Sequence, residues 1–401
     1  MRRPDVSAIP ITHLVASGQY VLYFGITGMH LPYFNLYCYH LGFSGMEIGV
    51  LSALRSLAMV VFPIAWSLLA DRTRSRRPIY ILCTCASAAI WSLFLATEAF
   101  PAMVLITAVY GMFHAPIISF LESITMEVLG AARQNYGRVR LWGSLSFIAM
   151  VLLFGPVIER FSVRVIVPSI LAGSLLLAAM SATVPRDRPS GRRLGAANAG
   201  MLRRPRPLAF LLCGFLMLAS HGACYGFFSI HLERLGCSAA FIGGAWALAS
   251  GSEIVAMLYS AALFARFPLE RVLLVSMAVA ALRWFILGWV GSPAVILATQ
   301  LLHALTYGTF HMASILYVDR ESPPDGKNLG QAVNSALTYG LGLMTGFLIT
   351  GHVYARAGSF AAFQVCGLLA LAGAGIWAAT CARGRPAGEG ISPAAGPMRD
   401  G

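Results

Sequence analysis

Charged residues are scarce in this chain. Asp, Glu, Lys and Arg make up 11% of its 401 residues, whereas hydrophobic residues make up 58%. Soluble proteins carry charge at about 25% of their positions, and a chain of this length cannot enclose so much apolar surface in cores of its own. A lipid bilayer accepts such surface in helical spans of about 20 residues. The composition therefore argues against a soluble protein and predicts an all-α integral membrane protein.

Sequence motifs of catalysis and of cofactor binding are also missing. The sequence contains no GxSxG, HExxH or P-loop pattern, so neither an enzyme nor an ATP-driven pump is expected. Its 8 cysteines form no CxxC pair, which argues against a disulfide framework and against a zinc site. No small-residue cleavage site follows the short basic segment 1–10, so we expect no removable signal peptide. The sequence thus predicts no enzyme, no metal and no cofactor.

Apolar runs account for most of the chain. Twelve can be drawn, at residues 15–39, 46–70, 78–97, 101–129, 138–159, 164–184, 208–232, 239–265, 270–290, 293–318, 330–355 and 359–382. With residue 1 in the cytoplasm, the cytoplasmic loops and ends hold 22 Lys and Arg, and the outer loops hold 4. Membrane proteins carry their excess of basic residues in cytoplasmic loops. The net charge of +13 therefore indicates topology rather than nucleic-acid binding, and both termini are expected inside.

Short sequence echoes indicate an internal repeat. Three segments of the first half return in order in the second half, at offsets of 194, 197 and 196 residues: 41–49 at 235–243, 110–114 at 307–311, and 155–160 at 351–356. Two parallel copies with a binding site between them are typical of secondary transporters. We expect a six-helix half at 1–184, a Pro-, Gly- and Arg-rich cytoplasmic linker at 185–207, a second six-helix half at 208–382, and a disordered cytoplasmic tail at 383–401.

The loop after the second run carries a family signal. Its sequence at 70–77, ADRTRSRR, resembles the signature of the major facilitator superfamily, although Ser67 and Arg74 replace two glycines of that signature. The similarity extends over 15–382. It implies two six-helix pseudo-symmetric halves with twelve transmembrane helices.

Two further segments narrow the resemblance. The segment 136–143 resembles the fifth-helix motif shared by lactose permease and the phenylpropionate permease-like group, and the segment 300–311 resembles the latter group. The resemblance implies a proton-coupled permease. It also implies that Asp71 and Arg72 form a conformational latch at the inner face.

Ionisable residues inside membrane spans are costly and are therefore functional candidates. Residues equidistant from a turn lie at equal depth in a helical hairpin. Glu122 and Arg140 are equidistant from residue 131, and Glu253 and Arg283 are equidistant from Pro268. We expect each acid to pair with the base on the next helix. The alternative is that each pair only holds two helices together.

The resemblance gives these residues roles. Lactose permease-like proteins carry an acid and an Arg for substrate on helices four and five. They carry an acid, an Arg and a His for proton coupling on helices eight to ten. The resemblance therefore implies substrate contact for Glu122 and Arg140, and proton coupling for Glu253, Arg283 and His303.

Two positions depart from that family pattern. The acid expected one turn after His303, the main proton carrier, is Thr306, so Glu253 becomes the better candidate carrier and His303 the next. The Trp that stacks on sugar in helix five is Phe147. Phe147 stays a candidate substrate contact, but this difference argues against a galactoside.

Other candidates come from their depth or from the repeat. We expect substrate contact from four aromatic residues on helices one and seven, two His at equivalent repeat positions and one deep Arg: Tyr33, Phe34, Tyr225, Phe228, His114, His311 and Arg55. Each has a structural alternative. Aromatic residues form interfacial belts, the two His can serve packing alone, and Arg55 can snorkel or bind a backbone carbonyl.

Deep inside the predicted membrane spans, basic residues outnumber acidic residues by one. The deep basic residues are Arg55, Arg140 and Arg283, and the deep acidic residues are Glu122 and Glu253. A buried cation without a partner favours an anionic ligand. We therefore expect a monomeric proton symporter of the bacterial inner membrane for a small organic acid, best an aromatic one, whose carboxylate binds Arg140. The alternatives are a sugar or nucleoside symporter and a proton-driven exporter. A receptor without transport activity would not need charges paired in both halves.

Overall fold

The computed structural model describes residues 11–73, 75–130, 135–185, 200–324 and 326–383. Within these ranges the chain is helical and contains no strand. The first half consists of α1 (Ile11–His40), α2 (Gly45–Thr73), α3 (Arg76–Trp91), α4 (Phe100–Leu129), α5 (Tyr136–Phe161) and α6 (Ile166–Ser181). The second consists of α7 (Pro205–Ala219), α8 (Gly222–Arg234), α9 (Ala239–Arg266), α10 (Leu269–Trp289), α11 (Pro293–Gln300), α12 (Phe310–Glu321), α13 (Lys327–Asn334) and α14 (Leu343–Arg383). The segment 1–10, most of the predicted linker and the predicted tail lie outside the described residues.

In the described ranges, 9 helical segments are long and apolar enough to cross a membrane. Most coincide with one predicted run each. The segment Lys327–Arg383, of 57 residues, covers two runs and contains a non-helical residue between them, Gly358. The two remaining runs fall on α1 and on α11 with α12, which are not among the 9. The all-α membrane fold is confirmed, and the count of twelve crossings stays a prediction.

The first sequence echo forms the same turn in both halves. Gly42 follows α1 with φ 84°, and Gly236 follows α8 with φ 80°. Glycine adopts this left-handed conformation without strain and often ends helices for that reason. The amide of Phe43 donates to the carbonyl oxygen of Cys38 at 3.2 Å, and in the second half the amide of Cys237 donates to that of Leu232 at 3.0 Å. The first echo therefore corresponds to the same local structure in both halves.

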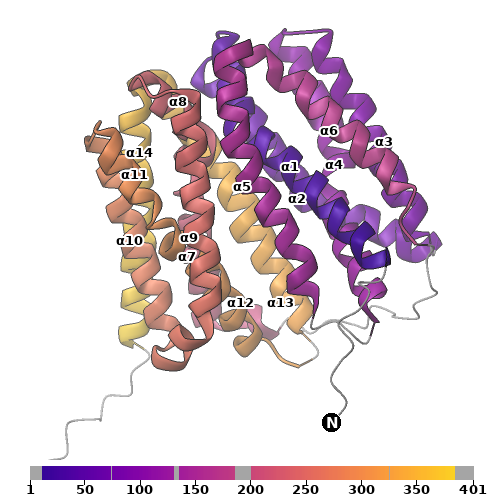
Figure 1. The fold of residues 1–401 in the computed structure, drawn as a ribbon. Coiled ribbons are helices and arrows are strands. Elements are labelled where there is room, and N and C mark those ends of the chain that lie inside the picture. Colours follow the sequence, from indigo (N-terminus) through magenta and orange to yellow (C-terminus); the bar gives the residue numbers. More distant parts are fainter. Residues whose placement is uncertain (1–10, 74, 131–134, 186–199, 325, 384–401) are drawn as a thin grey trace, which may run out of the picture.

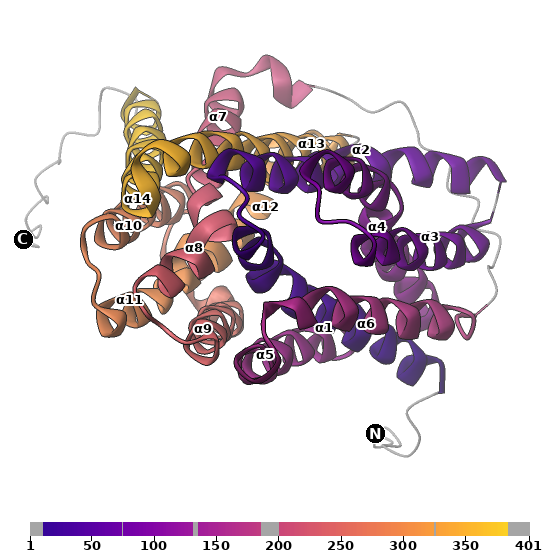
Figure 2. The same ribbon diagram turned by 90° about the horizontal axis from the view of Figure 1, so that it is seen from above.

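The two halves lie side by side (Figure 1), and seen from above they meet along two seams (Figure 2). In one seam α5 packs against α9, and in the other α2 packs against α14. The third echo lies in these seams. A Cβ added to Gly155 would lie 2.5 Å from the carbonyl oxygen of Ala239, and one added to Gly351 would lie 2.6 Å from that of Gly45. Here the backbones of the two halves touch, and we call this end of the bundle the closed end.

Hydrogen bonds join the halves at the closed end as well. The Glu159 carboxylate of α5 accepts from the amide of Ala240 at 2.8 Å, in the first turn of α9. An exposed ion pair joins His40 to Glu233 at 2.7 Å. These contacts hold the halves together at the end opposite the linker.

The linker end of the first half is held by an arginine. Arg77 of α3 donates from Nε to the carbonyl oxygen of Val184 and from Nη2 to that of Ala182, both at 2.7 Å. These two carbonyls lie just after α6. The chain is therefore fixed at the point where it leaves the first half.

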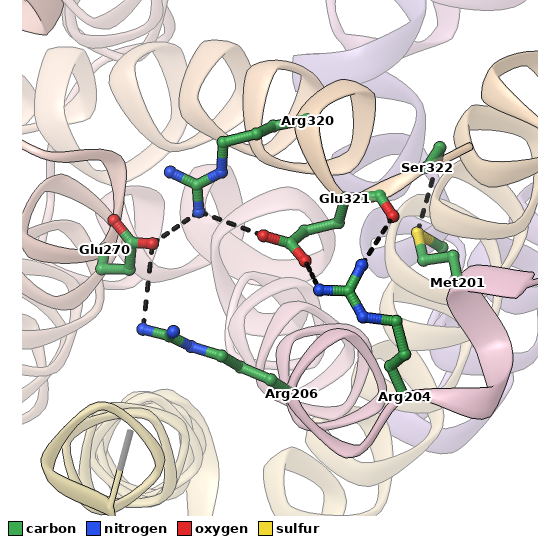
Figure 3. Close-up of polar contacts among 7 residues, drawn as sticks. All are labelled: Met201, Arg204, Arg206, Glu270, Arg320, Glu321 and Ser322. Carbon is green, nitrogen blue, oxygen red and sulfur yellow. Dashed lines mark hydrogen bonds and ion pairs between the residues drawn. The ribbon is translucent and has the colours of Figure 1, made fainter. Parts of the chain in front are cut away.

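A charge cluster holds the linker end of the second half (Figure 3). Arg204 pairs with Glu321 at 2.7 Å, and Arg206 at the start of α7 lies 3.9 Å from Glu270 of α10. Arg320 of α12 contacts both carboxylates. The chain is thus tied to α10 and α12 where it enters the second half.

Candidate functional site

A central cavity of about 560 Å³ lies between the halves. The first half lines it with residues of α1, α2, α4 and α5, and the second half lines it with residues of α7, α8, α9, α14 and the turns around His303 and Tyr339. We call these two sides the first wall and the second wall. Seven predicted site residues line the cavity: Arg55, His114, Arg140, Phe147, Tyr225, Glu253 and His303. The cavity is of the size that encloses a small organic molecule.

Arg55 of α2 carries a positive charge on the first wall. Its Nη1 lies 3.0 Å from Nε2 of His30, and its Nη2 donates to Asn35 Oδ1 at 3.0 Å and to Ser52 Oγ at 3.2 Å. All three acceptors are uncharged, because a His nitrogen that accepts from an arginine carries no proton. The guanidinium also lies 5.6 Å from the ring centroid of Phe34. Among the ion pairs of the described residues, none includes Arg55.

Arg140 of α5 lies on the same wall but in different surroundings. Its guanidinium lies 3.9 Å from the ring centroid of Phe24. Glu122, the expected partner, instead accepts from the hydroxyl of Tyr136 at 3.3 Å and does not line the cavity. The direct pair predicted for Glu122 and Arg140 is therefore wrong within the described residues, although the two charges are close enough to interact.

The second wall brings together the three residues assigned to proton coupling, in an order that was not expected. Glu253 of α9 lies 3.9 Å from Nε2 of His303, and His303 Nδ1 accepts from Arg283 at 3.0 Å. The direct pair predicted for Glu253 and Arg283 is therefore wrong, because His303 lies between them. Since Nδ1 accepts, a neutral His303 carries its proton on Nε2, the nitrogen that faces Glu253.

Arg283 is fully buried behind the second wall and does not line the cavity. It donates to Gln300 Oε1 at 2.7 Å and to Thr306 Oγ1 at 3.1 Å. The cation that interacts with Glu253 through space is Arg140, which lies on the opposite wall. The two walls are thus coupled electrostatically across the cavity.

The repeated histidines occupy similar but not equal sites. His114 stacks on Tyr110, with 4.7 Å between ring centroids, and both line the cavity. His311 stacks on Tyr307 at 6.0 Å and lies 2.7 Å from the Tyr339 hydroxyl. His311 does not line the cavity, although Tyr307 and Tyr339 do. Only the first-half member of the pair is placed for direct substrate contact.

Three predicted aromatic contacts point elsewhere. The hydroxyl of Tyr33 donates to the carbonyl oxygen of Val151 at 2.9 Å, in the seam between α5 and α9. Phe34 packs against Trp91 with 5.3 Å between ring centroids, and Phe228 packs against Trp246 at 6.0 Å. Tyr33, Phe34 and Phe228 thus do not line the cavity in this structure, because their rings pack within and between helices.

Several lining residues were not selected from the sequence. These are His30, Tyr23, Phe24, Tyr110, Trp246, Tyr307 and Tyr339. The repeat of the segment 110–114 offered a usable signal for Tyr110 and Tyr307, since a shared motif brought both to the cavity. Tyr307 and Tyr339 lie in π-helical stretches, Ala304–Thr309 and Ser335–Gly342, which are frequent at functional sites.

The predicted latch residues lie at the linker end, outside the cavity. Asp71 pairs with Arg76 of α3 at 3.3 Å, and Arg72 is exposed. Asp71 also lines a small groove on α2 together with Pro63, Ile64, Ser67 and Leu68.

Known proteins resemble this chain in sequence and in fold. A family model described as "MFS_1 like family" matches residues 13–365. The "Probable 3-phenylpropionic acid transporter" of Escherichia coli (strain K12) is 26% identical over 361 residues, which cover 88% of this chain and 93% of that one. The "Maltose permease" of Geobacillus stearothermophilus is 25% identical over 376 residues, covering 92% and 95%. The crystal structure of nucleoside transporter NupG covers 92% of this chain and 98% of its own at TM-score 0.81 and 18% identity, so the two share a fold.

Proposed function

Because this chain belongs to the MFS_1-like family of multi-pass membrane transporters, we propose that it carries a small organic acid together with protons. The observation that carries this proposal is the charge of the cavity lining, where Arg55 and Arg140 face a single carboxylate, Glu253. One cation is in excess, and a substrate carboxylate neutralises it in a site of low dielectric. An aromatic acid is the first candidate, because Phe24 and Phe147 offer ring contacts beside these charges. The relative named as a 3-phenylpropionic acid transporter supports the same class.

Proton coupling is assigned to Glu253 with His303 and Arg283. A carboxylate holds a proton more readily when a nearby cation moves away. Glu253 lies on α9 and Arg140 lies on α5, so a rotation of one half against the other changes the distance between them. Alternating access would then bind the proton in one state and release it in the other. His303 places its Nε2 toward Glu253 and is a second proton carrier in this scheme.

A sugar or nucleoside is the second candidate cargo, moved by symport or by proton-driven export. Trp246 lines the second wall and offers an aromatic face that a sugar ring could stack on. The relative named as a maltose permease supports this alternative. The substrate test therefore includes neutral sugars and nucleosides beside the acids.

The membrane orientation follows from the placement of basic residues. We propose a location in the bacterial inner membrane, with both termini and the linker in the cytoplasm and the closed end outside, so that this structure is an inward-facing state. The transporter is taken to act as a monomer. A reporter inserted in 185–207 is expected to read cytoplasmic, because seven Arg lie in that segment. An outer reading would invert the orientation of every helix.

Uptake into proteoliposomes tests the proposal directly. Purified protein is given labelled benzoate, phenylacetate, 3-phenylpropionate, maltose and uridine, with and without an imposed pH gradient. We expect an aromatic acid to accumulate when the outside is acidic, and a protonophore to abolish the accumulation. Accumulation of maltose or uridine alone would favour the second candidate. Uptake of an acid that ignores the pH gradient would remove proton coupling.

A further inference from the structure

We infer that Arg55, rather than Arg140, is the anchor for the carboxylate of the substrate, in a subsite of the first wall that His30, His114 and Tyr110 complete. This inference rests on the proposed transport of an organic acid. It places the carboxylate of the substrate at Arg55, whereas the family resemblance placed it at Arg140.

The charges around the two arginines differ. Arg140 interacts through space with Glu122 on one side and with Glu253 across the cavity. The positive charge of Arg140 is therefore already neutralised in part by carboxylates of the chain. The hydrogen bonds of Arg55 go to Asn35, Ser52 and His30, which are all uncharged. The excess cation of the cavity is thus located at Arg55.

The guanidinium of Arg55 is held in a defined orientation. Asn35 is buried, and its amide nitrogen donates to Ser52 Oγ and to the carbonyl oxygen of Gly226, both at 3.0 Å. His30 stacks on Phe34, with 5.1 Å between ring centroids. A preorganised guanidinium loses little freedom when it binds a carboxylate, and its planar fork matches the two oxygens.

The neighbours of Arg55 suit an anion. His30, His114 and Tyr110 line the cavity together with Arg55, and Arg55 lies close enough to His114 to act on it electrostatically. The imidazole of His114 and the phenol of Tyr110 can donate hydrogen bonds to carboxylate oxygens, whereas both ring nitrogens of His30 face Nη1 of Arg55, at 3.1 and 3.0 Å. Tyr23 stacks on His114, with 5.6 Å between ring centroids, so the aromatic side of the cavity begins beside this subsite.

Asn35 also connects this subsite to the other half, since Gly226 belongs to α8. A carboxylate that binds Nη2 of Arg55 competes with Asn35 Oδ1 for the same donor. Substrate binding would therefore act on a hydrogen bond network that spans both halves at the level of the cavity.

The test compares one acid with its neutral amide. Binding of 3-phenylpropionate and of 3-phenylpropanamide is measured by calorimetry on the wild-type chain and on the Arg55→Gln, Arg55→Lys, Arg140→Gln and Arg164→Gln variants. Arg164 is the matched control, because its side chain is 75% exposed at the closed end. We expect Arg55→Gln to weaken binding of the acid about 10- to 100-fold and to leave binding of the amide within about 3-fold. Arg55→Lys should recover part of the affinity, since an ammonium group keeps the charge without the planar fork.

The outcomes separate the two proposals. If Arg55→Gln keeps the wild-type preference for the acid while Arg140→Gln loses it, the anchor is Arg140 and the proposed transport of an acid stands. If the wild-type chain binds none of benzoate, phenylacetate and 3-phenylpropionate, the organic-acid function and this assignment are both overturned. If Arg55→Gln binds neither ligand, a thermal unfolding curve decides. If the Tm of Arg55→Gln equals that of the wild-type chain, Arg55 does not distinguish the acid from the amide, and the assignment is overturned. If the Tm is lowered, Arg55→Lys becomes the deciding variant, and the assignment requires that it still bind the acid more tightly than the amide.

Discussion

On the first wall of the cavity Arg55 is surrounded by uncharged groups, whereas on the second wall Glu253, His303 and Arg283 form a chain of ionisable groups. The first wall carries an excess positive charge that a substrate can neutralise. The second wall holds the single carboxylate of the cavity lining, Glu253, and changes its charge only by gaining or losing a proton. In the proposed function the two walls divide the work, with recognition of the cargo on the first wall and coupling to protons on the second.

The largest effect is expected from Glu253→Gln, which removes the titratable group of the second wall. Gln resembles the protonated acid, so the variant should still bind cargo and exchange it across the membrane. It should lose accumulation against a gradient, because no proton is released inside. Counterflow and uphill uptake in proteoliposomes measure the two activities separately, with Glu98→Gln as the control, since Glu98 is half-exposed at the closed end. Normal uphill uptake by the variant would assign the proton to another group, with His303 next.

Arg283→Gln should lower stability by about 2–4 kcal/mol, because it breaks a buried network and leaves Glu253 near a His without a cation behind it. Adding Glu253→Gln should restore part of this loss, since the second change removes a carboxylate that the loss of Arg283 leaves with one nearby cation fewer. Thermal unfolding of the wild-type chain, both single variants and the double variant gives the coupling free energy. Strict additivity would show that His303 isolates the two residues from each other.

Transport with the two walls in these roles also requires the two halves to separate at the closed end, each moving as a rigid body. A Cβ added to Gly243 would lie 2.1 Å from the carbonyl oxygen of Val151, whereas one added to the adjacent Gly244 meets nothing within 4 Å. Gly243→Ala should therefore disfavour the closed seam by about 1–3 kcal/mol, and Gly244→Ala should have no effect. Spin-label distances across the closed end measure the populations. Equal distances in both variants would mean that the seam yields without separating the halves.

The smallest effect is expected from Tyr33→Phe. This change removes a hydroxyl that donates to Val151 O and costs about 1 kcal/mol of stability. Substrate affinity should not change, because Tyr33 does not line the cavity. A clear loss of affinity, measured by the same calorimetry, would mean that Tyr33 belongs to the substrate site. The seam between α5 and α9 would then not be separate from the wall of the cavity.

The sequence predicted the depth of a residue in the membrane better than the direction in which its side chain points. Apolar runs located the helices, and equal distance from a turn placed Glu253 and Arg283 at a depth where His303 contacts both of them. Depth alone does not tell which face of a helix a side chain occupies, so the intervening His303 and the seam position of Tyr33 were missed.

The π-helical stretches add a second reason for these misses. The segments Ala304–Thr309 and Ser335–Gly342 do not follow the 3.6-residue period on which face predictions depend. Tyr307 and Tyr339 therefore reach the cavity from positions that a regular helix would turn elsewhere. One cation in excess was predicted from counting charges, but the inference that it is Arg55 required the hydrogen bonds of the structure.

The arginine contacts at the linker end have a mechanical consequence. Val184 is fixed by Arg77, and the chain is fixed again at Arg204 by Glu321. The 16 steps from Val184 to Gly200, where a short 3-10 helix begins, can span at most about 53–58 Å at 3.3–3.6 Å per residue. Each end of the connection is thus fixed to its own half, so these anchors do not set the angle between the halves. We therefore expect changes in the length of the connection to affect transport little, because backbone contacts between the halves lie in the glycine seams.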